Sequence, residues 1–532
     1  MRILINFLLA DIMQLSTIDL SVFVTYVIAL IGIAYWVSRE KSGHQKNTKD
    51  YFLAGNSLPW WAVGASLIAA NISAEQIIGM SGSGYAIGLA IASYEWMAAI
   101  TLIIVGKYFL PIFLKRGIYT MPQFLEQRFD HRVRTILAVF WLGVYVFVNL
   151  TAILWLGALA IYTVTGVDMF YGMLFLGAFA AAYSLYGGLK AVALTDIIQV
   201  VILVVGGLLL SFICLDMIGD GQGIFVGFAS LVEQAPGHFD MILDKDNPHY
   251  MSLPGISVLV GGMWIMNLSY WGFNQYIIQR TLAAKSLEEG QKGIVFAAFL
   301  KLLMPIIVVL PGIAAVILAP QLDRPDQAYP VMMQLMPVGI KGLVFAALVA
   351  AIVSSLGSMI NSIATIFTMD LYAYHKPDRS EEHYVRVGRG VAFSALVVAM
   401  ICAKPLLGSF DQAFQYIQEF TGFFTPGIVA LFLLGMFWKR TTAHAALIAA
   451  IGSAVFSLLF KFLLPELPFI DRVGLVFILC MVLPIITVFV EKAGEHENAV
   501  QLADIDFTTT SSFNIATVGI VLILTALYAT WW

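Results

Sequence analysis

The chain has 532 residues, of which 60% are hydrophobic and 12% are charged, and its net charge is −4 at pH 7. Soluble proteins average about 25% charged residues, so this composition excludes an ordinary soluble domain. The acidic balance argues against nucleic-acid binding, and neither a P-loop nor zinc-ligand spacing occurs. We therefore expect an all-α polytopic protein that lies in a lipid bilayer.

Fourteen apolar runs are long enough to cross a bilayer. They lie at residues 18–38, 57–80, 84–113, 135–164, 167–186, 189–216, 253–275, 291–319, 340–371, 386–407, 410–437, 441–463, 472–491 and 513–531. With the N-terminus outside, the inner loops would hold 20 of the 29 Lys and Arg residues and the outer loops seven, which agrees with the positive-inside rule. The sequence therefore predicts about fourteen transmembrane helices in the inner (plasma) membrane, with the N-terminus outside.

Two of these runs carry polar residues where lipid requires hydrocarbon. Run 57–80 is interrupted at Ala69–Gln76, and run 253–275 is interrupted at Met266–Trp271. Backbone that leaves helical pairing must line a cavity inside the protein. Paired interrupted helices in corresponding halves of a chain indicate the binding site of a secondary transporter.

Each break begins a unit of five runs. Because five is odd, the second unit would be inverted relative to the first, as in the inverted repeats of sodium-coupled transporters. We therefore expect an N-terminal helix with an inner loop, a first five-helix repeat, an outer loop, a second five-helix repeat and three C-terminal helices. These segments are residues 1–56, 57–216, 217–252, 253–437 and 438–532.

Ionisable residues inside apolar runs are functional hypotheses by default. Glu95 lies roughly 16 Å from the end of its run, and it would either bind substrate or pair with a neighbouring helix. Lys301 lies roughly 13 Å deep, although its flexible stem could recover part of that distance. Asp196 lies nearer the inner face, and we expect it to support a cation site rather than to bind the ion directly.

The pair Ser354-Ser355 shares one helical face with Ala351. Sodium is a hard cation, and hard cations take oxygen ligands. Two hydroxyls and the Ala351 carbonyl, opposite the freed carbonyls of the first break, would form a neutral five-oxygen cage for sodium. Serine pairs in membrane helices also serve as packing contacts or bond to their own backbone, and that alternative stays open.

Amides and aromatic residues complete the candidate set. Gln76, Asn267 and Gln418 lie in three different runs, and each amide offers both donors and acceptors, which suits a neutral, hydroxyl-rich substrate. Tyr270 and Trp271 could stack on the C–H face of a sugar, or they could serve as packing or as a gate. The runs contain no arginine suited to clamp a carboxylate, which disfavours an amino-acid or organic-acid substrate.

The chain resembles the sodium:solute symporter family from Tyr51–Gly55 through Phe414–Glu419. The most specific stretches are residues 57–96, 272–280 and 345–362. The resemblance implies a fourteen-helix LeuT-type fold of two inverted five-helix units. It also implies symport of a neutral hexose, of the galactose or glucose type, with sodium as the co-transported ion.

The resemblance also implies roles for individual residues. The implied sodium ligands are the carbonyls of Ala69, Ile72 and Ala351 and the hydroxyls of Ser354 and Ser355, with Asp196 on the sodium exit path. The implied sugar ligands are Gln76, Glu95, Asn267, Lys301 and Gln418, with Tyr270 as the inner gate. We count Tyr94 and Trp271 with the substrate-binding residues, and Asn71 and Asn149 match supporting amides.

Two positions depart from the family pattern. Ala98 stands where a serine ligand is expected, and Ser269 stands where a tyrosine precedes the gate tyrosine. Loss of one hydroxyl ligand costs about 0.5–1.5 kcal/mol net. We therefore expect an altered hexose preference with sodium coupling unchanged.

Other functions remain open at this point. The same fold could carry another neutral solute, such as a polyol, an amino sugar or a nucleoside. A transporter-like sensor would need an effector domain, and we expect none after Trp532. A membrane enzyme is disfavoured because no nucleophile–base pair or metal cluster occurs in any run, and proton coupling is disfavoured because a neutral oxygen cage has no titrating group.

Overall fold

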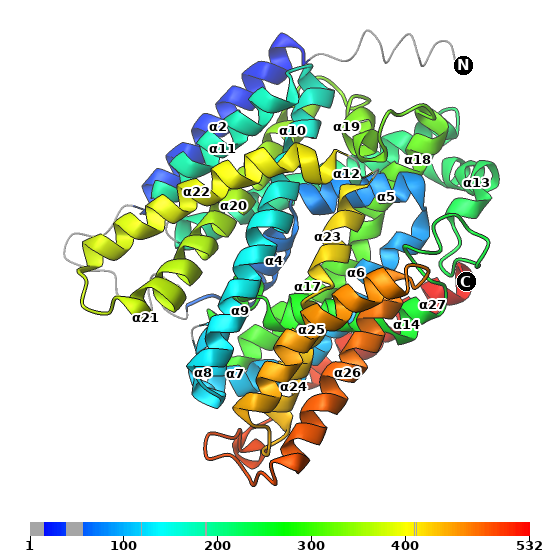
Figure 1. Ribbon diagram of the computed structural model, residues 1–532. Helices are drawn as coiled ribbons and strands as arrows, with labels where there is room; N and C mark the ends of the chain where they lie inside the picture. The colour runs from blue at the N-terminus through cyan, green and yellow to red at the C-terminus, as the bar shows by residue number, and fades with distance from the viewer. Residues whose placement is uncertain (1–14, 39–56, 119, 187–188, 409, 411) are drawn as a thin grey trace.

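The computed structural model describes residues 15–38, 57–118, 120–186, 189–408, 410 and 412–532 (Figure 1). Within these residues the chain is helical, and its only β pairing is an isolated bridge between Leu58 and Ala284. The expected all-α architecture is therefore confirmed for the described part of the chain. Most of the expected inner loop before residue 57 lies outside the described residues.

The helices of the first half begin with α2 and end before the long segment that precedes α14. They are α2 (Thr17–Ser38), α4 (Trp60–Asn71), η2 (Glu75–Gly79), α5 (Met80–Ala86), η3 (Leu89–Ala92), α6 (Ser93–Ile104), η4 (Val105–Phe109), α7 (Leu110–Arg116), α8 (Met121–Arg128), α9 (His131–Val144), η5 (Tyr145–Leu150), α10 (Thr151–Thr165), α11 (Met169–Tyr186), α12 (Leu189–Ile218), α13 (Ile224–Gln234) and η6 (Pro236–His238).

The helices of the second half also contain π-helical turns within several long helical runs. They are α14 (Ser257–Val260), α15 (Gly262–Leu268), η7 (Ser269–Phe273), α16 (Gln275–Leu282), α17 (Leu287–Met304), η8 (Pro305–Val309), α18 (Leu310–Leu318), η9 (Pro325–Gln327), α19 (Ala328–Met333), α20 (Ile340–Thr365), η10 (Ile366–Tyr372), α21 (Ala373–His375), α22 (Glu381–Leu407), α23 (Ala413–Thr421), α24 (Thr425–Phe437), α25 (Ala443–Leu463), α26 (Phe469–Val490), η11 (Leu502–Asp504) and α27 (Ser511–Thr530).

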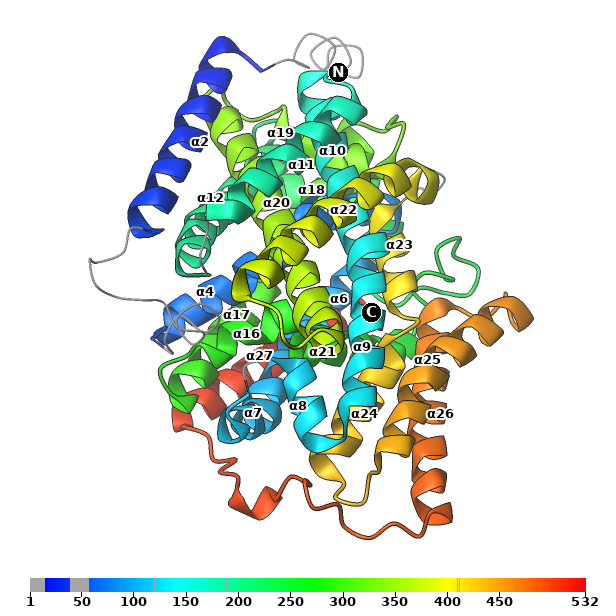
Figure 2. The ribbon, with the colours of Figure 1, turned by 60° about the vertical axis from the view of Figure 1, so that its left-hand side comes forward.

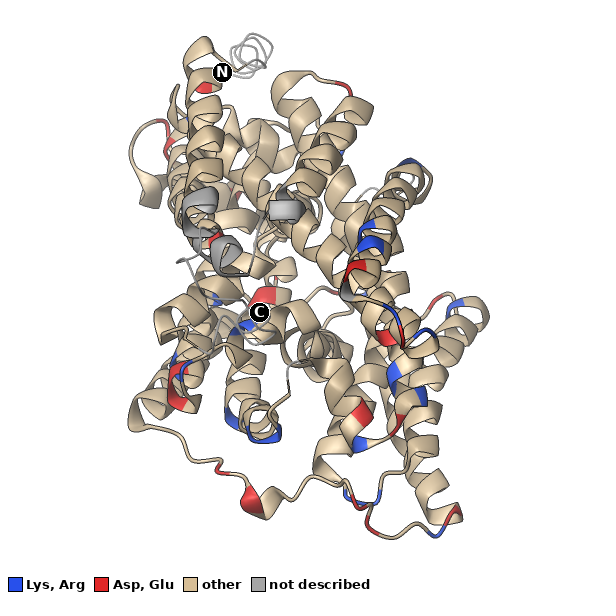
Figure 3. Cartoon of the chain, turned by 90° about the vertical axis from the view of Figure 1, so that its left-hand side faces the viewer, with Lys and Arg blue, Asp and Glu red and all other residues tan. Residues whose placement is uncertain are grey.

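In the described part of the chain, nine helices or continuous helix runs are long and apolar enough to cross a membrane. The number rises to eleven if each of two bent pairs counts as one span. All fourteen apolar runs expected from the sequence fall on helical segments. The polytopic architecture is therefore confirmed, while the count of fourteen spans stays a prediction. Figure 3 shows charged residues to be sparse along the helices and gathered toward helix ends and connections.

The first break lies where the sequence places it. Helix α4 ends at Asn71, Ile72 has extended backbone angles, and η2 resumes at Glu75 with a bend of 67°. The Ser73 hydroxyl accepts a hydrogen bond from the Glu75 N–H at 3.2 Å, so a side chain replaces one of the backbone partners lost at the start of a helix.

The second break lies slightly later than expected. Helix α15 continues through the π-helical segment η7, and the extended residue is Asn274 rather than a residue of Met266–Trp271. The expected segment therefore stays helical, with wider turns, and the chain leaves the helix just before α16. A further bend of 45° separates α23 from α24, and sequence reasoning missed it.

Glycines let the first broken helix lie close to α17, which carries Lys301. A Cβ built on Gly64 of α4 would lie 2.6 Å from the Gly293 carbonyl oxygen, and one on Gly293 would lie 2.7 Å from Val63. Small residues at such a contact allow backbones to approach closely within a membrane. The close contact brings the end of α4, at Asn71, within reach of a lysine on its neighbour.

The remaining helices surround this pair. Helix α20 packs against α2, α11 and α12, and α4 also contacts α12. Helices α25 and α26 lie side by side at the edge of the molecule, as Figure 2 shows, and the segment after α26 runs along one end before α27 returns to pack against α6 and α17.

Candidate functional site

A cavity with an empty volume of about 670 Å³ lies against both broken helices. We call it the sugar cavity, after the substrate class that the sequence analysis predicts. Its wall holds all eight residues that the sequence analysis proposed for substrate binding, and also Asn71. The lining residues are Asn71, Glu75, Gln76, Tyr94, Glu95, Met266, Asn267, Ser269, Tyr270, Trp271, Asn274, Lys301, Phe414, Gln418, Thr421 and Thr425.

A buried ion pair forms the polar centre of the sugar cavity. Lys301 Nζ lies 2.6 Å from Glu95 Oε2, and the two residues are 0% and 3% exposed. The ammonium also donates to Asn71 Oδ1, and Gln76 Nε2 donates to Glu95 Oε1. The charges are therefore paired and hydrogen-bonded, as buried charges must be. Four residues proposed to bind substrate or support the site are bonded to one another in this geometry.

Aromatic rings close one side of this polar centre. The Lys301 ammonium lies 4.8 Å from the centre of the Trp271 ring, and Trp271 packs edge-to-face on Tyr270. The Tyr270 hydroxyl accepts a hydrogen bond from Asn71 Nδ2 at 3.1 Å. Tyr270 is therefore tied to the first break, which suits a gate whose position depends on that break.

The remaining sugar-cavity residues differ in which of their polar groups are available to bind a ligand. Asn267 Nδ2 donates to the Met263 carbonyl at 3.2 Å, which leaves its amide oxygen for other partners. Tyr94 packs edge-to-face on Phe414 and forms wall rather than a hydrogen-bonding group. Gln418 lines the cavity from α23, so three separate helical regions supply amides.

A second cavity, with an empty volume of about 430 Å³, also borders the first break. We call it the sodium cavity, after the ion that the sequence analysis predicts there. Three of the five proposed sodium ligands, Ala69, Ser354 and Ser355, line it. The other two, Ile72 and Ala351, are buried and are not part of its wall. The full lining is Ala69, Ala70, Ser73, Glu75, Ile153, Asp196, Tyr276, Arg280, Ser354, Ser355, Ser358 and Met359.

Asp196 lies in the wall of the sodium cavity and is bonded to a proposed ligand. The Ser354 hydroxyl donates to Asp196 Oδ1 at 2.6 Å, and Arg280 lies 3.7 Å from Asp196 Oδ2. Asp196 therefore orients a serine and is itself balanced by an arginine, as a supporting residue would be. The sequence analysis did not pair Arg280 with Asp196. Arg280 lies on α16, which follows the second break, and the sequence does not indicate how that break orients α16.

Two further residues join the site without having been proposed as ligands. Glu75 lines both cavities, and Asn149 Nδ2 lies 3.4 Å from its Oε1, which gives the expected supporting amide Asn149 a partner. Tyr276 lines the sodium cavity and donates its hydroxyl hydrogen to Tyr270 at 2.9 Å. The position of Glu75 directly after the first break was the available signal for it.

The two departures from the family pattern lie in different surroundings. Ser269 lines the sugar cavity, whereas Ala98 is 1% exposed and is not part of the wall. The expectation of an altered substrate preference therefore attaches to Ser269 in this structure, since a tyrosine at that position would fill part of the cavity.

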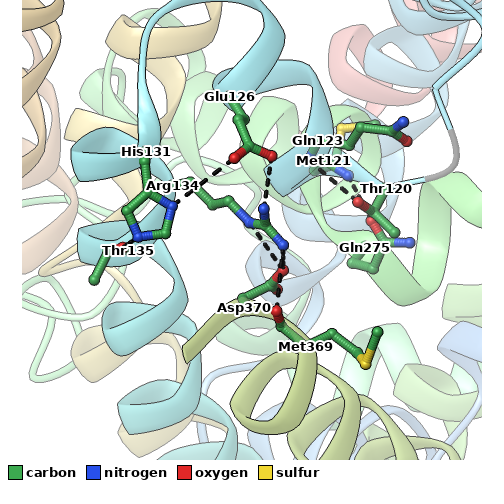
Figure 4. Close-up of polar contacts among 10 residues, drawn as sticks. All are labelled: Thr120, Met121, Gln123, Glu126, His131, Arg134, Thr135, Gln275, Met369 and Asp370. Carbon is green, nitrogen blue, oxygen red and sulfur yellow. Dashed lines mark hydrogen bonds and ion pairs between the residues drawn. The ribbon is translucent and has the colours of Figure 1, made fainter. Parts of the chain in front are cut away.

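Further polar contacts join residues that line neither cavity. The Ser83 hydroxyl donates to Gln412 at 2.9 Å and the Ala413 N–H donates to Asp326 at 2.9 Å, which ties α23 to α5 and η9. Figure 4 shows Arg134 between Asp370 and Glu126.

The contacts in Figure 4 connect four helical segments. Arg134 of α9 bonds to Asp370 of η10, and it lies 2.6 Å from Glu126 of α8. The Gln275 side chain of α16 accepts a hydrogen bond from the Met121 N–H at 2.7 Å. Helix α8 thus joins the segment after the second break to the start of α9 and to η10.

Comparison with protein families places most of the chain in one family model. The model of the sodium:solute symporter family matches residues 51–452. The chain is 56% identical over 537 aligned residues to the sodium/glucose cotransporter of Vibrio parahaemolyticus, with 97% of this chain and 99% of that protein covered. It is 34% identical to the human sodium/myo-inositol cotransporter 2, with 80% of this chain and 67% of that protein covered.

Comparison with solved structures supports the same fold. The structure of a Na⁺-coupled sialic acid symporter, in a substrate-bound outward-open state, matches with a TM-score of 0.77. That match covers 90% of this chain and 100% of the other chain at 24% sequence identity. At this identity the likeness concerns the fold alone.

Proposed function

Since the chain belongs to the sodium:solute symporter family, we propose that it carries a neutral hexose into the cell together with sodium. The single observation that carries the proposal is the position of the two cavities. A polar, aromatic-walled cavity and an oxygen-lined cavity both border one broken helix, α4–η2. Movement of that break would change both sites at once, which is what coupling requires.

The proposed sodium site uses oxygen from two elements. The hydroxyls of Ser354 and Ser355 on α20 face the carbonyl of Ala69 at the end of α4, and the carbonyls of Ile72 and Ala351 complete the set. Asp196 holds Ser354 in place. Because the ligands are neutral, the ion brings its full charge through the membrane field, which supplies about 2.3 kcal/mol per 100 mV. That energy corresponds to roughly a 50-fold accumulation of a neutral sugar.

The proposed sugar site exchanges internal hydrogen bonds for bonds to substrate. Glu95, Lys301, Gln76 and Asn267 present donors and acceptors to the hydroxyl groups, and Gln418 approaches from α23. Tyr270 and Trp271 lie against the ring and, with Tyr94, complete the apolar wall. The charged members contribute most, because hydrogen bonds to charged groups are worth about 1.5–3 kcal/mol.

The finer architecture belongs to the same proposal. We infer fourteen membrane spans with the N-terminus outside, and a LeuT-type inverted repeat in which residues 57–216 and 253–437 form the two five-helix units. Residues 1–56, the outer loop 217–252 and residues 438–532 complete the chain. Support comes from the agreement of all fourteen apolar runs with helical segments and from the Lys and Arg distribution. In this proposal the protein transports its substrate unchanged and is not an enzyme.

A second candidate substrate class is a cyclic polyol. Ser269 leaves space in the cavity wall, and the human relative in the comparison is a sodium/myo-inositol cotransporter. Purified protein in proteoliposomes would be tested for uptake of radiolabelled glucose, galactose and myo-inositol, with a sodium gradient or with equal sodium on both sides. Gradient-dependent uptake of a hexose above myo-inositol supports the leading proposal, the reverse order supports the polyol, and equal uptake without a gradient rejects both.

A further inference from the structure

Glu75 is the one described residue that lines both the sugar cavity and the sodium cavity. It begins η2 directly after the first break, and its N–H bonds to the Ser73 hydroxyl at 3.2 Å, which fixes the turn that carries it. The carboxylate therefore lies at the junction of the two cavities, where an ion moving from one to the other must approach it.

The other acid in each cavity has a basic partner. Glu95 lies 2.6 Å from Lys301 in the sugar cavity, and Asp196 lies 3.7 Å from Arg280 in the sodium cavity. Among the residues that the structure describes, no lysine, arginine or histidine forms an ion pair with Glu75. When Glu75 is ionised, each cavity therefore carries one unbalanced negative charge, and the same carboxylate supplies it to both.

The surroundings of Glu75 offer the ligands that a hard cation prefers. Asn149 lies 3.4 Å from the carboxylate through its amide. The hydroxyls of Tyr276 in the sodium cavity and Tyr270 in the sugar cavity lie 2.9 Å apart, so they join the two walls. Carboxylate, amide and hydroxyl oxygens are all ligands of hard cations. The basic residue that lines the sodium cavity, Arg280, is paired with Asp196.

We propose that Glu75 is a staging site that binds the co-transported sodium ion transiently, between the sugar cavity and the neutral cage at Ser354 and Ser355. This inference rests on the proposed sodium symport. A fixed negative charge in a cavity raises the local concentration of cations and the rate at which they bind. The neutral cage then holds the ion, because it offers five oxygen ligands to a hard cation.

A staging role for Glu75 predicts a specific change in the kinetics of sodium binding. Loss of the charge at position 75 slows the arrival of sodium at the cage, while the number of ions carried per sugar stays the same. Loss of a cage hydroxyl has the opposite signature, because it speeds release and leaves arrival almost unchanged.

The test uses the full-length protein in lipid nanodiscs without sugar. Sodium is added by stopped-flow mixing at constant ionic strength, and the change in intrinsic tryptophan fluorescence is followed, with Trp271 in the sugar-cavity wall as the local reporter. Glu75→Gln keeps the shape of the side chain and an oxygen for the Asn149 amide. We expect its sodium association rate constant to fall at least tenfold, whereas Ser355→Ala raises the dissociation rate constant.

Two further variants separate charge at this position from other effects. Glu288→Gln removes a half-exposed acid on α17, and the association rate should stay within twofold of the wild type. Glu75→Asp restores the charge, and it should recover most of the rate. An unchanged association rate in Glu75→Gln, or failure of Glu75→Asp to recover it, overturns the staging site.

The ion count supplies the second decisive measurement. Uptake of ²²Na⁺ and labelled sugar is measured in the same proteoliposomes, and the sodium-to-sugar ratio should be equal in wild type and Glu75→Gln. If Glu75→Gln carries one sodium ion fewer per sugar than the wild type, Glu75 holds a second transported ion, and that result overturns the staging site. The proposed symport fails separately, and first, if the wild-type protein itself shows no sodium-dependent uptake.

Discussion

Lys301 and Glu95 form an ion pair at 2.6 Å in the interior of the helical core, with both side chains almost completely buried. The sequence left two interpretations for each residue, as a substrate ligand or as a structural partner for a neighbouring helix. The structure is consistent with both interpretations, because the ion pair lies in the wall of a cavity and is held there by hydrogen bonds to Asn71 and Gln76.

The first prediction separates the two roles of this pair. Lys301→Met leaves Glu95 buried without a cation, and breaking a buried pair in this way costs about 3–5 kcal/mol. The single variant should therefore have a clearly lower Tm in nanodiscs, whereas Lys301→Met combined with Glu95→Gln should regain most of the stability. Both should lose at least tenfold in sugar uptake. Recovery of uptake in the double variant would show that the pair is structural only.

The matched control for this cycle is Lys292, which lies 2.7 Å from Glu288 on the same helix with both side chains well exposed. Surface pairs contribute about 0–1 kcal/mol. Lys292→Met should therefore leave both Tm and sugar uptake close to the wild-type values.

The second prediction concerns the two serines of the proposed sodium cage. Ser355→Ala should raise the sodium concentration for half-maximal uptake about three- to tenfold, which corresponds to the loss of one hydrogen-bonding oxygen. Ser354→Ala should have the larger effect, because Ser354 also donates to Asp196 at 2.6 Å. Ser362→Ala is the control, since that hydroxyl bonds to its own helix at Ser358. Equal sodium dependence in all three variants would contradict the cage.

The third prediction concerns substrate choice. Ser269→Tyr places a ring in the cavity wall and should change the ratio of glucose to galactose uptake at least threefold, while sodium dependence stays the same. Ala98→Ser should leave that ratio unchanged, because Ala98 is buried away from the wall. Competition between the two epimers measures the ratio. A shift in Ala98→Ser alone would mean that the helix around Glu95 is rotated relative to this structure.

The fourth prediction concerns the contacts between α9 and η10. The Arg134 and Asp370 side chains are 21% and 11% exposed, so their hydrogen bond should be worth about 1.5–3 kcal/mol. Asp370→Asn should lower the Tm, and the loss should be much smaller when Arg134→Gln is already present. Thermal unfolding of the four proteins of this cycle in nanodiscs measures the coupling.

The exposed pair Arg132–Asp130, at 2.7 Å, is the control for this fourth cycle. Both side chains are more exposed than those of Arg134 and Asp370, so Arg132→Gln should change the Tm little. A coupling energy no larger than that of the exposed pair would contradict the prediction.

The sequence alone determined the class of protein and indicated which residues to propose for its binding site. Polar residues such as Asn71 and Glu95 in spanning-length apolar runs can be stable only beside other protein groups, so their presence indicated a cavity without any coordinates. The helical spacing of Ala351, Ser354 and Ser355 was sufficient to place them on one face. All eight proposed substrate residues do line one cavity in the structure.

Only the tertiary structure decided which of these groups meet. Lys301 and Glu95 are 206 positions apart, and Arg280 and Asp196 lie on different helices, so no local pattern could pair them. The extended residue of the second break is Asn274, because the π-helical turns of η7 carry the helix past the polar residues that marked the expected break. In the sequence, Ala98 and Ser269 are both departures from the family pattern, but only Ser269 lines the sugar cavity. Such contacts depend on the rotation and crossing of whole helices, which side-chain packing between distant segments sets.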